Sequence, residues 1–314
     1  MIVVLTGGTG GAKFVQGLAA VVPARELTII VNTGDDLTWW GLHVSPDLDS
    51  VTYALAGILS RERGWGVEDD TFHCLDAMRR MGSPAWFQIG DRDLATHLRR
   101  TELLSEGRTL SKVTKEIAGA LGVNARILPM SNDRVETRVL TGDGELSFQE
   151  YFVRERYQVP ARGVRFDGAE RARPAPGVLE AIAQAEAVVI APSNPITSVG
   201  PILAVPGICE ALRQTTAPVA AISPIIGGAA VSGPAGELMQ TQGLPVSIAG
   251  VACCYTDFLD LLIADQRDSA LGPRVEDIAV CYTSTLMKSE GDKTALAQSV
   301  LGFLRERSIE AAAS

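Results

Sequence analysis

The stretch IVVLTGGTGGAKF, residues 2–14, decides the fold. It begins with a short apolar run rich in β-branched residues, continues through four glycines, and leads into a helical pattern of apolar residues. Glycines allow positive φ and a close approach of the backbone to a ligand. The free N–H groups at the start of the following helix carry a partial positive charge, so we expect a phosphate or diphosphate to bind here.

The glycine turn matches neither standard phosphate-binding fingerprint. A GxGxxG motif that starts at Gly8 needs its third glycine where Lys13 stands, and a P-loop needs a Lys-Ser or Lys-Thr pair after the last glycine. Glycines that serve only close packing remain an alternative. We expect phosphate binding without ATP hydrolysis, through Gly8, Thr9, Gly10, Gly11 and Lys13.

A second apolar run, Leu27 to Val31, ends in Asn32-Thr33-Gly34-Asp35-Asp36. Nearly continuous apolar runs are typical of parallel strands that are buried on both faces. Strand, helix and strand within about 30 residues predict a βαβ unit. Ligands in such sheets bind at the carboxyl ends of the strands, so Asn32 and Asp35 should lie beside the glycine turn. Asp35 and Asp36 suit a ribose or a metal ion, or only cap a loop.

The remaining pattern predicts an α/β, Rossmann-like, doubly wound and mainly parallel sheet with a helical insertion and a β-hairpin. We expect residues 1–50 and 122–314 to form the nucleotide-phosphate-binding core, and residues 51–121 to form a mostly helical insertion that contributes to the acceptor site. Within the insertion, residues 85–89 suggest a short strand or an extended segment, 90–93 a turn and 94–100 a helix. The other expected elements are strands at 127–130, 187–191, 219–222 and 246–251, a hairpin of 135–140 with 145–153, and a terminal helix at 295–307.

Composition excludes several classes of protein. The 314 residues are 46% hydrophobic and 21% charged with a formal net charge of −9, which argues against a general nucleic-acid binder. The five cysteines have no CxxC spacing, and three histidines make an all-protein zinc site unexpected. We see no signal peptide and no apolar run of the roughly 20 residues that a membrane span needs. A cytoplasmic enzyme without a membrane partner is the expectation.

Asp47 and Asp49 are the leading candidates for chemistry. They lie two residues apart just before a predicted helix near Val51, and on a strand-like segment they would point the same way. Two such carboxylates suit a shared Mg²⁺ that bridges diphosphate oxygens, or one accepts a proton from an attacking hydroxyl. The alternative is a helix N-cap and a solvated neighbour.

Aromatic residues and histidines are open to two interpretations. Trp39, Trp40, Trp86 and Phe87 suit either a platform for a flat ring or the hydrophobic core. His43 and His97 are expected to be structural or exposed rather than catalytic.

Six motifs follow one another along the chain. They are GGTGGAK at 7–13, NTGDD at 32–36, PDLDSV at 46–51, WFQIGDRD at 86–93, MSNDRV at 130–135 and APSNP at 191–195. In this order they resemble the 2-phospho-L-lactate transferase (CofD) family of coenzyme F420 biosynthesis, and the resemblance extends to about residue 230.

This resemblance implies a reaction and a set of roles. The family transfers a phospho-three-carbon acid, phospholactate or phosphoenolpyruvate, from a guanosine-diphosphate-linked donor to the hydroxyl of the deazaflavin Fo. GMP leaves and Mg²⁺ is required. The residues implied to bind the donor are those of the glycine turn with Asn32, Asp35, Ser193 and Asn194. The resemblance places Mg²⁺ near Asp47 and Asp49. It places Fo near Asp49, Gln88, Trp86 and Arg134, with Trp39 as an alternative neighbour of the ring. Many relatives carry Lys where Gln88 stands, which leaves a hydrogen bond but no charge there.

Two other readings stay open. YvcK-like proteins, which bind a UDP-sugar and act in regulation, share the glycine turn and the Ser-Asn-Pro motif, but residues 46–50 and 86–93 fit the transferase better. A Rossmann-like oxidoreductase lacks support because no GxGxxG motif is present. The apolar helical insertion suggests a homodimer.

Overall fold

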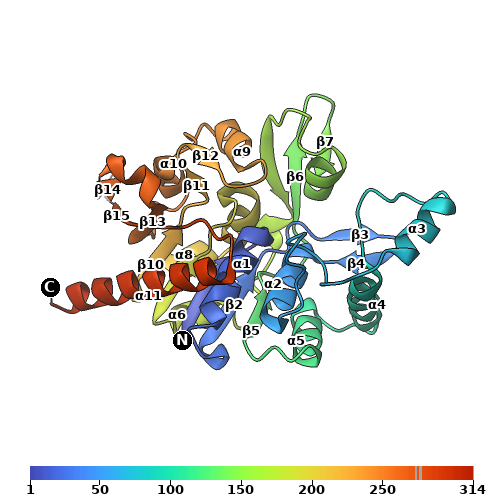
Figure 1. Ribbon diagram of the computed structural model, residues 1–314, viewed down its shortest axis with the longest axis horizontal. Coiled ribbons are helices and arrows are strands. Elements are labelled where there is room, and N and C mark those ends of the chain that lie inside the picture. Colours follow the sequence, from blue (N-terminus) through green and yellow to red (C-terminus); the bar gives the residue numbers. More distant parts are fainter. Residues whose placement is uncertain (273, 276–277, 314) are drawn as a thin grey trace.

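The computed structural model describes residues 1–272, 274–275 and 278–313. Its centre is an eight-stranded sheet in the order β14-β15-β13-β10-β9-β1-β2-β5 (Figure 1). Every pairing in it is parallel except that of β14 with β15, which confirms the predicted mainly parallel α/β sheet. The strands are β1 (Ile2–Thr6), β2 (Leu27–Val31), β5 (Arg126–Pro129), β9 (Ala187–Ile190), β10 (Val219–Ile222), β13 (Leu261–Asp265), β14 (Arg274–Val275) and β15 (Ile278–Thr283).

The strand order reverses between β1 and β9. From β1 the chain adds β2 and β5 on one side, then returns to add β9, β10 and β13 on the other. The register pairs Leu5 with Ile30 and with Ile190, so the segments that follow the three strands leave the sheet at one edge. Such a switch point opens a crevice between the diverging loops. The predicted meeting of the glycine turn, residues 32–36 and residues 192–194 is confirmed.

Helices cover both faces of the sheet. Val4 of β1 faces a core that includes Phe14 and Leu296, while Val3 and Leu5 face a second core with Ile182 and others. This alternation along one strand follows from the two-residue period of a β-strand. The first face carries α1 (Gly8–Ala19), α2 (Pro46–Ala56), α5 (Leu110–Ala120) and α11 (Glu290–Ala313); the second carries α6 (Val178–Ala183), α7 (Gly200–Ala204), α8 (Ile208–Gln214), α9 (Ala235–Thr241) and α10 (Ile248–Cys253).

The segment 51–121 divides into two parts. The end of α2 and α5 pack on the sheet, whereas α3 (His73–Arg80) and α4 (Asp91–Ser105) extend away from it beside the hairpin of β3 (Leu37–Trp39) and β4 (Leu42–Val44). Figure 1 shows α3 and α4 at the end of the molecule opposite the C-terminus of α11. The boundaries at residues 50 and 122 stay a prediction.

A second, three-stranded sheet stands next to the switch point. It has the order β7-β6-β8, with β6 (Glu136–Leu140), β7 (Glu145–Ser147) and β8 (Gly163–Asp167). The predicted hairpin is confirmed, but its second strand does not reach residue 153, because the chain enters a π-helix, η2 (Glu150–Arg154). The remaining short elements are η1 (Ala24–Glu26), η3 (Ala169–Arg171), η4 (Pro195–Val199), η5 (Gln266–Leu271), β11 (Ile225–Ile226) and β12 (Ala229–Ala230).

Several sequence predictions were wrong in detail. The expected strand at 246–251 is largely helix α10, whose first turn is capped by Ser247: its Oγ accepts a bond from the Gly250 N–H at 3.4 Å. The expected turn at 90–93 already belongs to α4, and residues 85–89 form no strand. The terminal helix α11 extends beyond the predicted 295–307 at both ends. Sequence reading missed β3, β4, β8, β13 and β15.

Within the described ranges, no single helix is both long and apolar enough to cross a membrane. The joined segments Pro195–Ala204 and Ile208–Gln214 meet the length and composition test only as a pair bent by 88°.

Candidate active site

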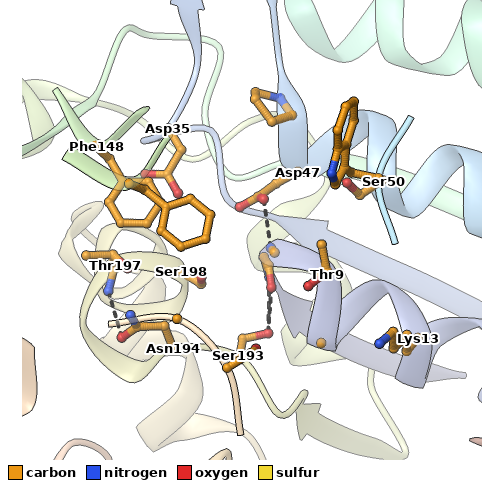
Figure 2. A pocket seen from close by; sticks show the side chains of 18 of the residues that line it. Thr9, Lys13, Asp35, Asp47, Ser50, Phe148, Ser193, Asn194, Thr197 and Ser198 are labelled. Carbon is orange, nitrogen blue, oxygen red and sulfur yellow. Dashed lines mark hydrogen bonds between the residues drawn. The ribbon is translucent and has the colours of Figure 1, made fainter. Parts of the chain in front are cut away.

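The glycine turn brings three distant segments together. Helix α1 begins at Gly8, whose φ of +69° is readily adopted by glycine. The Gly8 N–H donates to Asp47 Oδ1 at 2.7 Å, and Ser193 Oγ donates to the Gly7 carbonyl at 2.8 Å (Figure 2). The turn is thereby held to α2 on one side and to the loop after β9 on the other.

Close packing requires three of these glycines, since a Cβ at Gly11 would overlap Thr6 Oγ1. A Cβ at Gly7 would lie 2.5 Å from Asp47 Oδ2, and a Cβ at Gly10 would lie 2.5 Å from the Pro192 carbonyl oxygen. The interpretation that these glycines serve close packing therefore holds together with the ligand-binding interpretation. Because glycine has no side chain, Asp47 and the loop after β9 can approach the turn.

A cavity of about 880 Å³ opens over this edge of the sheet. Of the predicted residues, it is lined by Gly8, Thr9, Gly10, Lys13, Asp35, Asp47, Asp49, Trp86, Gln88, Ser193 and Asn194. Gly11, Asn32 and Arg134 are not among its lining. Gly11 is buried, and Arg134 pairs with Glu136 at 2.8 Å with its side chain 86% exposed, so the predicted Fo contact at Arg134 has no support in the geometry.

Two predicted ligand-binding amides instead hold the site together. Asn32 donates to Asp47 Oδ2 at 3.0 Å and to the Thr197 carbonyl at 3.3 Å, and its Oδ1 accepts from the Gly34 N–H at 2.7 Å. Asn194 Oδ1 accepts from the N–H groups of Ile196 and Thr197 at the start of η4. Figure 2 shows Asn194 turned toward Thr197 in this way. Asn32 and Asn194 thus stabilise the segments that surround the cavity.

Asp35 and Asp47 form an electrostatically unbalanced pair. Both are buried, and Figure 2 shows their carboxyl groups pointing toward one another. Burial, followed by the charge of Asp47, raises the pKa of Asp35 well above its ordinary value. Burial also raises the pKa of Asp47 to about 6, although the hydrogen bonds from Asn32 and Gly8 oppose the rise. Asp35 Oδ1 is buried without a hydrogen-bond partner among the described residues.

Asp36 is buried next to this pair but has its own partners. Ser45 Oγ donates to Asp36 Oδ2 at 2.7 Å, and His43 Nε2 lies 3.0 Å from the same oxygen. Burial still raises the pKa of Asp36 above its ordinary value. His43 therefore has the structural role that the sequence suggested.

Asp49 lies in a charge-balanced cluster. The guanidinium of Arg100 on α4 contacts both of its oxygens, with Nη1 donating to Oδ2 at 3.1 Å and Nη2 contacting Oδ1. His97 Nδ1 is 3.6 Å from Asp49 Oδ2, and His97 Nε2 is 3.3 Å from Asp93 Oδ1. Tyr53 donates to the same Asp93 oxygen at 2.7 Å. Although burial opposes it, contact with His97 lowers the pKa of Asp93.

The expectation that Asp47 and Asp49 point the same way is wrong. Both lie in the first turn of α2, which begins at Pro46 with Ser45 as its N-cap residue. Residues two positions apart in an α-helix are separated by roughly 200° around its axis, so the side chains of Asp47 and Asp49 diverge. Neither acid is the N-cap, and Asp47 faces the glycine turn while Asp49 faces α4.

The aromatic residues divide between core and cavity. Trp39 is buried and meets Trp86 edge-on at 4.7 Å between ring centroids, whereas Trp86 and Phe87 line the cavity. Phe148 and Phe152 also line it, stacked with centroids 5.5 Å apart and planes 4° from parallel. Phe152 is 37% exposed, which leaves part of its ring open to a planar ligand.

Phe148, Phe152 and Arg100 were not predicted as site residues. His97 is buried between Asp49 and Asp93, in agreement with the structural role expected of it. The Phe148 and Phe152 spacing of four residues is a helical signal that the strand interpretation of 145–153 obscured. The pairing of Arg100 with Asp49 joins residues far apart in the chain and left no local signal.

Comparison with known proteins yields one family model, 2-phospho-L-lactate transferase CofD, which matches residues 2–292. The 2-phospho-L-lactate transferase of Methanothermobacter thermautotrophicus is 44% identical over 304 residues, covering 96% of this chain and 97% of its own. The phosphoenolpyruvate transferase of Streptomyces coelicolor is 46% identical over 301 residues, covering 94% of each.

Among solved structures, a UPF0052 family protein from Bacillus halodurans superposes with a TM-score of 0.62 at 19% identity. The match covers 96% of this chain and 98% of that one. At this identity the likeness shows a shared fold.

Proposed function

The chain belongs to the CofD family of 2-phospho-L-lactate transferases, and from this premise we propose that it makes the phosphodiester of Fo. The donor is a guanosine-diphosphate-linked three-carbon acid. The acceptor hydroxyl attacks the phosphorus that carries the acid and releases its proton to solvent. The bond from that phosphorus to the bridging oxygen breaks, and GMP leaves with that oxygen. Relatives named for phospholactate and for phosphoenolpyruvate are similarly close, so the proposal includes both acids.

One observation supports this proposal: a single cavity combines a glycine turn at a helix N-terminus with aromatic walls. The turn at the β1–β9 switch point supplies N–H groups at a helix N-terminus, and Lys13 and Ser193 line the same cavity. Trp86 and Phe152 line it too and suit a flat ring such as a deazaflavin. A diphosphate donor and a planar acceptor therefore have complementary surfaces within one space.

The residues fit a divalent cation at Asp35 and Asp47 rather than at Asp47 and Asp49. Two buried carboxylates with raised pKa values and one oxygen without a partner favour a bound cation. No group of three or more His, Cys, Asp or Glu side chains suited to a metal occurs in the described part of the chain. Mg²⁺ needs only one or two carboxylates when substrate phosphates complete its shell. When bound it would neutralise phosphate charge.

The protein's own groups position the two substrates. The N-terminus of α1 holds the diphosphate of the donor, with Lys13 adding a positive charge. Asp49 accepts a hydrogen bond from the acceptor hydroxyl, and Gln88 offers a neutral hydrogen bond to Fo. Phosphoryl transfer depends mostly on such positioning and on charge neutralisation.

The test is a direct assay. Purified protein is incubated with Fo, Mg²⁺ and either a guanylylated lactate or a guanylylated enolpyruvate donor, and products are identified by mass spectrometry. We expect GMP and the phosphodiester of Fo with at least one donor. No product with either donor, together with tight binding of a UDP-sugar, would contradict the proposal and favour the YvcK-like regulatory alternative.

A further inference from the structure

Arg100 is a buried cation beside the cavity. It is 2% exposed, it lies on α4, and its guanidinium spans both oxygens of Asp49 on α2. Burying an ion pair costs desolvation that its attraction only partly recovers, so such a pair is weak evidence for stability alone. Asp49 lines the cavity, so the ion pair lies where it can affect a bound substrate.

The two-pronged contact fixes the plane of the Asp49 carboxylate. A guanidinium that donates to both oxygens restricts rotation about the bond that carries the carboxylate, whereas a single contact would not. Each carboxylate oxygen can accept two hydrogen bonds, so each retains a second acceptor position after Arg100 has taken the first.

Charged and titratable groups close around the pair from two helices. His97 Nδ1 lies 3.3 Å from Arg100 Nη1 and 3.6 Å from Asp49 Oδ2. Asp93 and Tyr53 lie on the far side of the His97 ring, joined by their own hydrogen bond. These neighbours leave little freedom for Asp49 to change its orientation.

We propose that Arg100 is a positioning residue for the transfer. It holds the Asp49 carboxylate so that a free acceptor position of that group receives the hydrogen bond of the attacking hydroxyl. Arg100 acts through Asp49 and does not touch the substrate. This inference rests on the proposed function and extends it to a residue on the helical insertion, 51 positions away in the chain.

A purely structural role is the competing explanation, because the same ion pair ties α2 to α4. The two explanations differ in what they change. A tie between helices affects the folded fraction and the stability. A positioning residue also lowers the kcat/KM for Fo of properly folded protein and leaves the KM for the donor nearly unchanged.

The test uses three single variants of the full chain. R100Q removes both the charge and the two-point contact with Asp49. R100K keeps the charge but loses the two-point contact, and R99Q is the matched control. Arg99 is the adjacent residue on α4, and it pairs with Glu102 and Glu116 on the surface. Thermal melting, and kinetics with Fo and donor varied separately, are measured for each.

We expect R100Q to lower kcat/KM for Fo on the order of 100-fold, the scale of a misplaced reacting group, with the KM for the donor nearly unchanged. R100K should fold and recover part of this loss, and R99Q should match the unmodified protein. R100K with unchanged acceptor kinetics and only a lower melting temperature would overturn the positioning role. A rise in the KM for the donor equal to that for Fo, with kcat unchanged, would overturn it too.

A double-mutant cycle covers the case in which R100Q does not fold. D49N/R100Q removes both buried charges together and should fold. If Arg100 acts through Asp49, the double variant transfers no more slowly than D49N alone; a further loss would overturn the inference. Unmodified protein that makes no product contradicts the proposed function itself, whereas active protein with insensitive variants contradicts only the role of Arg100.

Discussion

Asp47 and Asp49 share one helical turn but have opposite surroundings. Asp47 receives hydrogen bonds from two neutral donors, the Gly8 N–H and the Asn32 amide, and faces the acidic Asp35. Asp49 meets Arg100 through both oxygens and has His97 nearby. Among the described residues Asp47 has no positively charged partner, whereas Asp49 has Arg100.

The difference separates two tasks at one end of a helix. The side that lacks a positive charge suits a metal ion and the phosphates that the ion would bring. The balanced side suits a fixed hydrogen-bond acceptor for a neutral hydroxyl. The helical separation of roughly 200° between residues two apart makes this division possible within three residues.

The first and largest predicted difference between Asp47 and Asp49 is in catalysis. We expect D47N to lower kcat on the order of 1,000-fold and to weaken the dependence on Mg²⁺, because it removes charge from the phosphate side. D49N should instead mainly lower kcat/KM for Fo. Steady-state kinetics with Mg²⁺ titrated for each variant provide the comparison. An unchanged Mg²⁺ half-saturation in D47N would contradict the division.

The second prediction concerns stability and differs in sign between the two acids. D49N leaves the buried Arg100 without its counter-charge and should destabilise the protein by about 3 kcal/mol. D47N relieves repulsion with Asp35 and should stabilise the metal-free protein at neutral pH. Denaturant unfolding in EDTA measures both changes. Equal signs would mean that the environments are alike.

The third prediction tests the glycine turn. In G7A the new Cβ would lie 2.5 Å from Asp47 Oδ2 and 3.0 Å from Asn32 Cβ, so a shift of Asp47 is required. We expect a loss of about 2 kcal/mol in unfolding free energy from this overpacking, with weaker Mg²⁺ binding. G57A, at a helix end with nothing within 4 Å of its Cβ, is a stability control limited to backbone strain. Intact Mg²⁺ binding in G7A would show that Asp47 tolerates displacement.

The smallest effect is a pH dependence. The pKa of Asp47 is raised to about 6 from an ordinary 3.8, so this group favours the folded state when protonated and loses that contribution as pH rises through 6. Metal-free protein should gain about 1 kcal/mol from Asp47 between pH 7 and pH 5. Below about pH 4 the gain is offset, because carboxylates with lowered pKa values, such as Asp93, bind protons more readily in the unfolded chain than in the folded one. Urea unfolding across this range, with D47N as reference, should show the difference disappear in the variant.

The sheet and the place of the site were predictable from the sequence because both depend on local patterns. The apolar runs at β1, β2 and β9 are short and continuous, and each ends in small polar residues. Parallel strands align their carboxyl ends, so the meeting of the glycine turn with Asp35 and Ser193 followed from the order of these runs.

The orientation of the acids was not predicted because one helix boundary was misplaced. Ser45 followed by Pro46 is a signal for a helix start, with proline at the first helical position, whereas the predicted helix begins near Val51. Moving the start to Pro46 rotates Asp49 away from Asp47. The Arg100 contact then depends on tertiary packing of α4 against α2, which no window of local sequence contains.

The close approach of Gly7 to Asp47 also couples the residue types that evolution can accept at positions 7 and 47. A side chain at position 7 and an acid at position 47 compete for the same volume, so a descendant that keeps the acid must keep the glycine. A lineage that abandons the acid is released from this restriction. Across an alignment of relatives, a residue other than glycine at position 7 should therefore mark a chain that has lost the acid at position 47.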